Sequence, residues 1–276
     1  MHHVQANGAS IPALGFGTFQ MKGETAYAAV RHALDLGYRH LDTAQIYANE
    51  AEVGRALAES GVAREAVFLT TKVWIDRFTS DRLAPSVDES LRRLRTDYVD
   101  LLLLHWPNPD VPLAETIRAL NQVQRAGKTR HIGVSNFPTK LLREALALTD
   151  VPLVTNQVEY HPYLSQRAVL AVLREAGMCL TAYSPLAQGR LLDDPVLRTL
   201  GARYGKTPAQ VALRWLLQQD GVVAIPKAAR PEHAAANIDV FDFTLTDEEM
   251  RQIHGLARPD GRVVDPPGLA PAWDPA

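Results

Sequence analysis

Two patterns of apolar residues alternate along the chain. The first is a short continuous apolar run, and residues 97–105, "DYVDLLLLH", are the clearest case. Such runs are typical of parallel strands that are buried on both faces. The second pattern places apolar residues three or four positions apart, as in residues 25–37, where Ala26, Val30 and Ala33 share one helix face. The alternation predicts strand–helix units that follow one another through the sequence.

About eight such units can be counted. Strands are predicted at residues 11–17, 38–44, 66–73, 97–105, 130–136, 153–160, 178–185 and 221–227. Helices are predicted at residues 25–37, 49–61, 80–96, 113–127, 139–149, 166–177, around 194–218, and at 246–257. Eight units are the number that closes a parallel (β/α)8 barrel, an α/β fold. No low-complexity linker divides the chain, so we expect a single domain over residues 1–276 with a Pro/Gly-rich tail.

An open doubly wound sheet is the alternative, and its dinucleotide-binding form carries the fingerprint G-x-G-x-x-G between strand and helix. Residues 15–20, "GFGTFQ", keep only the first two glycines and lead into a polar loop. A second stretch, residues 201–207 "GARYGKT", resembles a phosphate loop but has three residues between its glycines where four are needed. We interpret Gly205 as the end of one helix and Thr207 as the start of the next. The barrel is therefore favoured.

Composition limits the classes of partner and the cellular compartment that fit this chain. A formal net charge of −2 gives no support to a nucleic-acid or membrane-surface partner, which usually requires a basic field. The single cysteine, Cys179, cannot form an internal disulfide, which fits a reducing compartment. The N-terminus lacks the features of a signal peptide, and no apolar run approaches the roughly 18 residues of a membrane span. We expect a cytoplasmic protein.

Ionisable side chains follow the ends of three successive predicted strands. Asp42 ends the second strand and Tyr47 follows it, Lys72 ends the third, and His105 ends the fourth. Each has an ordinary interpretation by itself, as a helix cap, a solvated lysine or a core histidine. In a parallel barrel, however, the carboxyl ends of the strands meet at one rim, where catalytic residues lie. Their convergence there favours a shared site.

The chemistry of the four residues is also compatible with one reaction. A free tyrosine has a pKa of about 10 and is a poor proton donor at neutral pH. A neighbouring ammonium group favours the phenolate and lowers that pKa, while a carboxylate holds the lysine charged and in place. A neutral imidazole nearby can orient a carbonyl oxygen. Together the four residues are expected to form a general acid directed at a developing alkoxide.

Seven ordered blocks of the sequence resemble the signature blocks of the aldo-keto reductases. They are "LDTAQIYANE", "TTKVW", "LLLLHWP", "IGVSNF", "NQVEYHP", "AYSPLAQG" and "AIPKAA". The first block and the closing "PPGLAPAWD" look closest to bacterial 2,5-diketo-D-gluconate reductases, which also reduce methylglyoxal. The resemblance implies a (β/α)8 barrel preceded by a hairpin at residues 2–11. It further implies NADPH-dependent reduction of small or sugar-derived carbonyl compounds by a monomer, with Asp42, Tyr47, Lys72 and His105 as the catalytic tetrad.

The same resemblance implies a set of cofactor-binding residues. Ser135, Asn136 and Gln157 match the residues that hold the nicotinamide carboxamide, and Tyr183 matches the ring stacked on the nicotinamide. Ser184 and Leu186 match pyrophosphate contacts. Independently of the family, Asn136 and Gln157 each end an apolar strand with an amide, which suits recognition of another amide.

The block after the eighth strand departs from the pattern of many family members. Residues 224–237, "AIPKAARPEHAAAN", keep Lys227 and Asn237, but the usual serine, arginine and glutamate positions hold Ala228, His233 and Ala236. We expect Arg230, three residues after Lys227, to supply the missing positive charge. The loops after strands seven and eight are a common phosphate site of such barrels. NADPH therefore remains the predicted cofactor.

The predicted substrate pocket uses aromatic residues. Phe19, Trp74 and Trp106 follow strands one, three and four and match pocket-lining positions of the family, beside His105. Ordinary rim packing is the alternative for these rings. Trp273 in the tail is a candidate to close over the pocket, whereas Trp215, within a helix, is interpreted as a core residue.

Three other functions fit the sequence less well. A regulatory, partner-binding barrel would not need Lys72 beside Tyr47. A metal-dependent hydrolase would need several ligands at one point, and the strand-end histidines His105 and His161 belong to no His-x-His or His-x-x-x-His pair. A glycosidase would need two opposed carboxylates, and Asp42, which could pair with Glu159, already has Lys72 as its expected partner.

Overall fold

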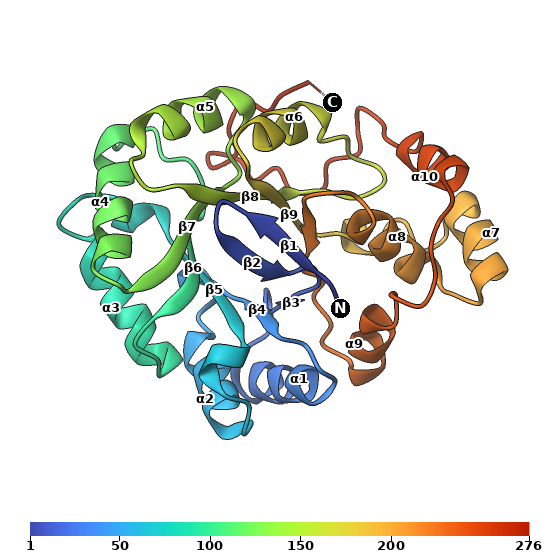
Figure 1. Cartoon of the computed structure of the whole chain (residues 1–276), viewed down its shortest axis with the longest axis horizontal. Coiled ribbons are helices and arrows are strands. Elements are labelled where there is room, and N and C mark those ends of the chain that lie inside the picture. The colour runs from blue at the N-terminus through green and yellow to red at the C-terminus, as the bar shows by residue number, and fades with distance from the viewer. Residues whose placement is uncertain (276) are drawn as a thin grey trace.

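Short parallel strands surrounded by helices dominate the computed structural model, which describes residues 1–275 (Figure 1). Eight strands form one sheet in which each pairs with the next along the chain. They are β3 (Phe16–Gly17), β4 (His40–Asp42), β5 (Phe68–Val73), β6 (Val99–Leu104), β7 (Thr129–Ser135), β8 (Leu153–Glu159), β9 (Cys179–Tyr183) and β10 (Val222–Ala224). Parallel bridges between Leu14 and Ala224 and between Gly17 and Lys227 join the first and last strands. The α/β prediction is confirmed, and the arrangement is consistent with a (β/α)8 barrel.

Helices cover the outside of this sheet (Figure 1). They are α1 (Gly23–Asp35), α2 (Glu50–Glu59), α3 (Leu83–Leu94), α4 (Leu113–Arg125), α5 (Thr139–Leu148), α6 (Arg167–Glu175), α7 (Pro195–Tyr204), α8 (Pro208–Leu217), α9 (Pro231–Ile238) and α10 (Asp247–His254). Helix α9 was not predicted, because its alanine-rich sequence has no stripe of large apolar residues. Gly205 ends α7 with a positive φ of 65°, and Thr207 caps α8, so "GARYGKT" is a helix junction.

A two-stranded hairpin precedes the sheet and corrects one predicted strand. Strands β1 (His3–Ala6) and β2 (Ala9–Pro12) pair antiparallel, as expected for residues 2–11. Asn7, at the turn, donates hydrogen bonds to carbonyl oxygens of Leu153, where β8 begins, and of Ala176, after α6. The hairpin therefore lies at the end of the strands opposite the predicted site. Residues 11–17 are divided between β2 and β3 rather than forming one strand.

Glycine explains why the first sheet strand is so short. A Cβ atom at Gly15 would lie 2.8 Å from the His40 ring, and one at Gly17 would lie 2.7 Å from the carbonyl oxygen of Ile225. Only glycine permits this approach, where the first strand meets its two neighbours. The core elsewhere is dense, because every residue of β5, β6 and β8 is buried. No helix within residues 1–275 is long and apolar enough to span a membrane.

Candidate active site

A cleft of about 620 Å³ lies at the carboxyl ends of the strands. Its lining comes from the loops after most of the strands and from the chain beyond α10. Among the predicted site residues, the lining includes Phe19, Asp42, Tyr47, Trp74, His105, Trp106, Ser135, Asn136, Gln157, Tyr183, Ser184 and Lys227. Of the other predicted residues, Lys72 lies buried beneath the cleft, and Leu186, Arg230 and Asn237 are outside its lining.

Lys72 connects the residues of the expected tetrad. Its ammonium group donates to Asp42 Oδ1, to the carbonyl oxygen of Thr43 at 2.9 Å, and to Tyr47 Oη at 3.3 Å. Asp42 and Lys72 are both buried. The charges of the ion pair compensate each other, which is what a buried pair requires. The strand-end argument therefore brought together residues that are in contact.

Electrostatics at this cluster differ in one respect from the expectation. Burial raises the pKa of Tyr47, and the charge and hydrogen bond of Lys72 only reduce that rise. Lys72 itself is buried, which alone would lower its pKa, but Asp42 and Tyr47 outweigh burial and raise it. The prediction that Lys72 acts to lower the Tyr47 pKa is correct. The expectation that the Tyr47 pKa is lowered overall is wrong, because burial disfavours the charged phenolate more than Lys72 stabilises it.

His105 lies against the same phenol. Its ring centroid is 5.6 Å from that of Tyr47 and 5.2 Å from that of Trp74, in edge-to-face arrangements. Burial first, and then the charge of Lys72, lower the pKa of His105 well below its usual range. The imidazole is therefore neutral at physiological pH, as expected. Its Nδ1 atom is buried and has no hydrogen-bond partner within residues 1–275.

The loop after β4 holds Tyr47 in place. Residues Gln45–Tyr47 form a short 3-10 helix that ends at Ala48, whose φ is 53°. The buried Asn49 side chain then donates to the carbonyl oxygens of Thr18 and Met21, both at 2.9 Å, and so ties this loop to the one after β3. This loop is fixed by buried polar contacts, which explains how a residue outside regular structure can be positioned accurately.

The expected nicotinamide residues form one connected group. Asn136 donates to the carbonyl oxygen of His105 at 3.0 Å and accepts from the Tyr183 hydroxyl at 2.8 Å. Ser135 donates to the carbonyl oxygen of Gln157 at 2.8 Å. Asn136 has a φ of 64°, a conformation that asparagine tolerates better than most residues. The group lies directly beside the tetrad.

Gln157 provides a link that the sequence did not reveal. Its Nε2 donates to Asp42 Oδ2 at 2.8 Å, while the other Asp42 oxygen accepts from Lys72. One carboxylate thus connects the proposed proton donor with the proposed cofactor group. The two residues are 115 positions apart, so only the closure of the sheet brings them together.

The end of β10 is more open. Lys227 is exposed and lines the cleft. Arg230 is also exposed, and its guanidinium lies 2.7 Å from His233 Nε2 and 3.6 Å from a Glu232 oxygen. Asn237 is buried in α9. Lys227 is therefore the better placed of the two cations for a ligand in the cleft.

The opposite side of the cleft is aromatic and apolar. Phe19 is 52% exposed and packs at 5.0 Å on the Tyr47 ring, and Ile46 beside it is 48% exposed. Trp74 and Trp106 also line this side. The tail of the chain also lines the cleft, which was not predicted from the sequence, with Val263, Val264, Asp265, Pro266 and Leu269. The family-like "PPGLAPAWD" block was the available signal.

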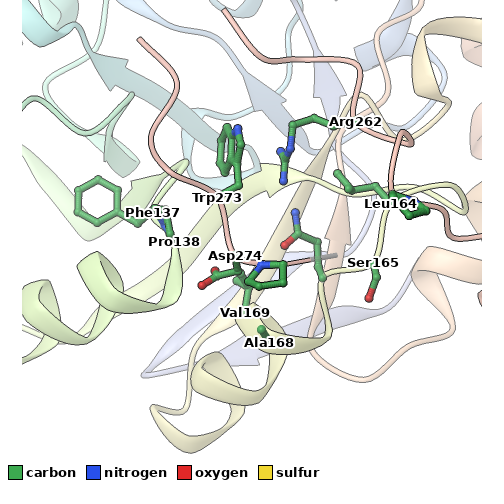
Figure 2. Close-up of a pocket in the computed structure, with 12 residues that line it drawn as sticks. Phe137, Pro138, Leu164, Ser165, Ala168, Val169, Arg262, Trp273 and Asp274 are labelled. Carbon is green, nitrogen blue, oxygen red and sulfur yellow. The ribbon is translucent and has the colours of Figure 1, made fainter. Parts of the chain in front are cut away.

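Trp273 does not lie over this cleft. It lines a separate cavity of about 150 Å³ behind the tail (Figure 2). Its ring packs edge to face on Trp106 at 6.1 Å, and its Nε1 donates to Asp265 at 2.8 Å. Trp273 thus supports the cleft wall from outside. Within residues 1–275, no group of three or more His, Cys, Asp or Glu side chains is placed to hold a metal ion.

Known proteins resemble this chain over almost its whole length. The sequence model of the Aldo/keto reductase family matches residues 13–258. Methylglyoxal reductase DkgB of Salmonella typhimurium is 46% identical over 268 residues, which cover 96% of this chain and 100% of the relative. Glyoxal reductase of Bacillus subtilis is 43% identical over 258 residues, 93% of this chain and 92% of the relative.

Solved structures agree with these matches. A crystal structure provisionally described as a 2,5-diketo-D-gluconic acid reductase B is 58% identical, with a TM-score of 0.98, 99% of this chain covered and 98% of the other. An aldo-keto reductase of Bombyx mori in complex with NADP is 34% identical, with a TM-score of 0.88 and coverage of 95% and 94%.

Proposed function

The chain belongs to the aldo/keto reductase family, and we propose that it reduces small or sugar-derived aldehydes and ketones to alcohols with NADPH. The main observation in support is that Lys72 contacts both Asp42 and Tyr47 at the floor of the cleft, beside a neutral His105. An ordinary binding protein would not need a phenol, an ammonium group and an imidazole in this arrangement. The single cysteine, which cannot form an internal disulfide, supports a cytoplasmic location.

Each residue of the tetrad has a distinct role in this proposal. Tyr47 donates the proton that converts the developing alkoxide into an alcohol. Lys72 stabilises the phenolate that remains, since its ammonium group lies 3.3 Å from the phenol oxygen. Asp42 holds Lys72 charged, and neutral His105 orients the carbonyl oxygen toward Tyr47. The aromatic wall excludes water from the reacting atoms.

The donor set of the cleft fits a nicotinamide cofactor. Ser135, Asn136 and Gln157 present a hydroxyl and two amides at one place, and the Tyr183 ring lies beside them, which suits a flat ring with a carboxamide. Lys227, on the far side of the cleft, suits an anionic group such as the 2′-phosphate of NADPH. When bound, NADPH supplies the hydride. Ser184 lines the cleft and is proposed as a pyrophosphate contact, with Leu186, Arg230 and Asn237 beyond the lining.

The loss of NADPH absorbance at 340 nm, which measures oxidation of NADPH, tests the proposal directly. The purified chain is supplied with NADPH or NADH and with methylglyoxal, glyoxal, benzaldehydes or keto-sugars. We expect carbonyl-dependent consumption of NADPH, and much slower consumption of NADH. A chain that binds NADPH tightly yet consumes none with any of these carbonyls would overturn the proposal in favour of a binding or regulatory role.

A further inference from the structure

A single glutamine joins the backbones that carry the two aromatic rings beside His105. We propose that Gln45 is a positioning residue for the proton donor, because its side chain fixes the short 3-10 helix that carries Tyr47. The inference rests on the proposed function, since Tyr47 is a proton donor only in that reaction. Gln45 does not line the cleft, so it acts through Tyr47 and not on the substrate.

Little apolar packing holds this 3-10 helix. All three of its residues are at least partly exposed, and Ile46 in its middle is 48% exposed. The helix ends at Ala48, whose positive φ of 53° is unfavourable for a residue with a Cβ atom. Short 3-10 helices also have poorer hydrogen-bond geometry than α-helices. The position of the helix therefore depends on the polar contacts of its side chains.

The phenol of Tyr47 is weakly held by its own contacts. The one hydrogen bond that its Oη atom makes within residues 1–275 is with Lys72, at 3.3 Å. Its ring lies 5.0 Å from that of Phe19, which is itself exposed, and 5.6 Å from that of His105. A shift of the 3-10 helix would therefore displace the proton donor directly.

Gln45 makes the contacts that this helix otherwise lacks. Its Oε1 accepts from the backbone N–H group of Trp74 at 2.9 Å, directly after β5. Its Nε2 donates to α3, where it lies 3.1 Å from the Ser90 hydroxyl and 3.2 Å from both the hydroxyl and the carbonyl oxygen of Ser86. Both serines are buried. One side chain thus joins the Tyr47 loop to a strand end and to a helix, which are rigid supports.

The same contacts determine the surroundings of His105. The rings of Tyr47 and Trp74 both pack edge to face on its imidazole, at 5.6 and 5.2 Å. Gln45 belongs to the helix that carries the first ring and bonds to the backbone of the second. Asn49 anchors the other end of the loop, toward β3. Loss of the Gln45 contacts should therefore loosen the end of the loop that precedes Tyr47.

Gln45→Met tests this role, because methionine keeps the length of the side chain and removes both its donor and its acceptor. Displacement of a reacting group by about 1 Å can cost about 100-fold in rate. We expect kcat with methylglyoxal and saturating NADPH to fall about 10- to 100-fold, less than when the general acid is removed completely. The affinity for NADPH, measured by fluorescence titration, should change little.

The solvent isotope effect separates misplacement of the donor from general damage. A donor that is displaced from the alkoxide makes proton transfer limit the rate more strongly. The ratio of kcat in H₂O to kcat in D₂O should therefore be larger for Gln45→Met than for wild type. Gln124→Met is the matched control, since Gln124 is a half-buried glutamine on α4 outside the cleft lining. It should leave both kcat and this ratio unchanged.

A second variant approaches the same contacts from α3. Ser86→Ala/Ser90→Ala removes two acceptors of Gln45, and alanine is favourable within a helix, so the fold should persist. We expect a smaller fall in kcat than for Gln45→Met, again with a larger solvent isotope effect. When the two sets of substitutions are combined, their effects should not add, because they remove the same interaction.

The outcomes distinguish this inference from the proposed function. A kcat close to that of wild type in Gln45→Met would overturn the inference alone, and the serine double variant decides in the same way if Gln45→Met does not fold. A lower kcat with an unchanged solvent isotope effect would also overturn it, because the loss would then come from general loosening. Absence of turnover by wild type with every carbonyl compound tested would overturn the proposed function and this inference with it.

Discussion

The two ends of the cleft are built in opposite ways. At the tetrad, Asp42 and Lys72 are buried, and each charged atom has a partner in the protein. At the end of β10, Lys227, Arg230 and His233 are all exposed. The tetrad is already arranged before any ligand binds. The end of β10 instead consists of long, solvent-exposed side chains.

This difference separates two tasks. Buried, prearranged charges cost no reorganisation during a reaction and act in a low-dielectric setting, where electrostatic effects are large. Exposed charges are screened, and their long side chains lose freedom when they bind an anion. The tetrad should therefore control the rate, and the β10 end should control which cofactor binds. Substitutions at the two ends should give effects of different kind and size.

Tyr47→Phe is expected to have the largest effect. It removes the proton donor and leaves the ring that packs on Phe19 and His105. Loss of a positioned general acid typically lowers a rate ~10²–10⁴-fold. NADPH affinity, measured by fluorescence titration, should change little. Tyr27→Phe, at a half-buried tyrosine on α1 outside the cleft lining, is the control. Turnover within a few-fold of wild type would exclude Tyr47 as the acid.

Lys72→Met is expected to have the next largest effect and to change the pH dependence. Burial raises the Tyr47 pKa and Lys72 opposes the rise, so removing the ammonium group raises that pKa further. The limb of the pH–rate profile that reports loss of the acid should move to higher pH, with the maximal rate about 10²-fold lower.

The single variant also leaves Asp42 buried without its cation, which destabilises the fold. The double variant Lys72→Met/Asp42→Asn removes both charges and separates catalysis from stability. An unchanged profile in a folded double variant would show that Lys72 does not act on Tyr47.

The buried end of the cleft was also the part that the sequence predicted well. The apolar run of residues 97–105 identifies β6, because each residue of this strand is buried against either the barrel interior or a helix. Once strands are placed, their carboxyl ends share a rim, so Asp42, Lys72 and His105 could be grouped from the chain alone. The Asp42–Gln157 hydrogen bond could not, because it depends on how the sheet curves between β4 and β8.

Three other features were harder to predict for physical reasons. Residues 263–269 have no helical or strand period. Hydrogen bonds from the Val263 and Val264 N–H groups to the buried Glu159 hold this segment, and the burial of Glu159 is visible only in three dimensions. The net direction of the Tyr47 pKa was wrong because contact with Lys72 can be inferred from sequence, whereas the cost of burial cannot. Similarity to the family predicts a set of cofactor positions but leaves the departure at His233 unexplained.

Lys227→Ala tests the open end of the cleft. Charge-assisted hydrogen bonds from Lys227 to the 2′-phosphate contribute about 1.5–3 kcal/mol each, which corresponds to roughly 10- to 150-fold in affinity. We expect NADPH binding to weaken by about that factor and NADH binding to stay nearly constant. The rate with saturating cofactor should barely change, in contrast to the tetrad variants. An unchanged ratio of NADPH to NADH affinity would contradict the phosphate-site assignment while leaving the tetrad unaffected.

Arg230→Ala should give the smallest effect, because Arg230 lies outside the cleft lining and already contacts His233 and Glu232. To reach a phosphate, its guanidinium must give up those contacts, so its net contribution should be less than that of Lys227. We expect NADPH affinity to fall less than about 10-fold, below the lower bound for one full charge-assisted bond. His233→Ala, which frees Arg230 from that neighbour, should leave NADPH affinity unchanged or raise it. A loss at Arg230 as large as that at Lys227 would show that the two ends of the cleft are less different than their exposure suggests. In that case Arg230 would have to reorganise into the cleft on binding.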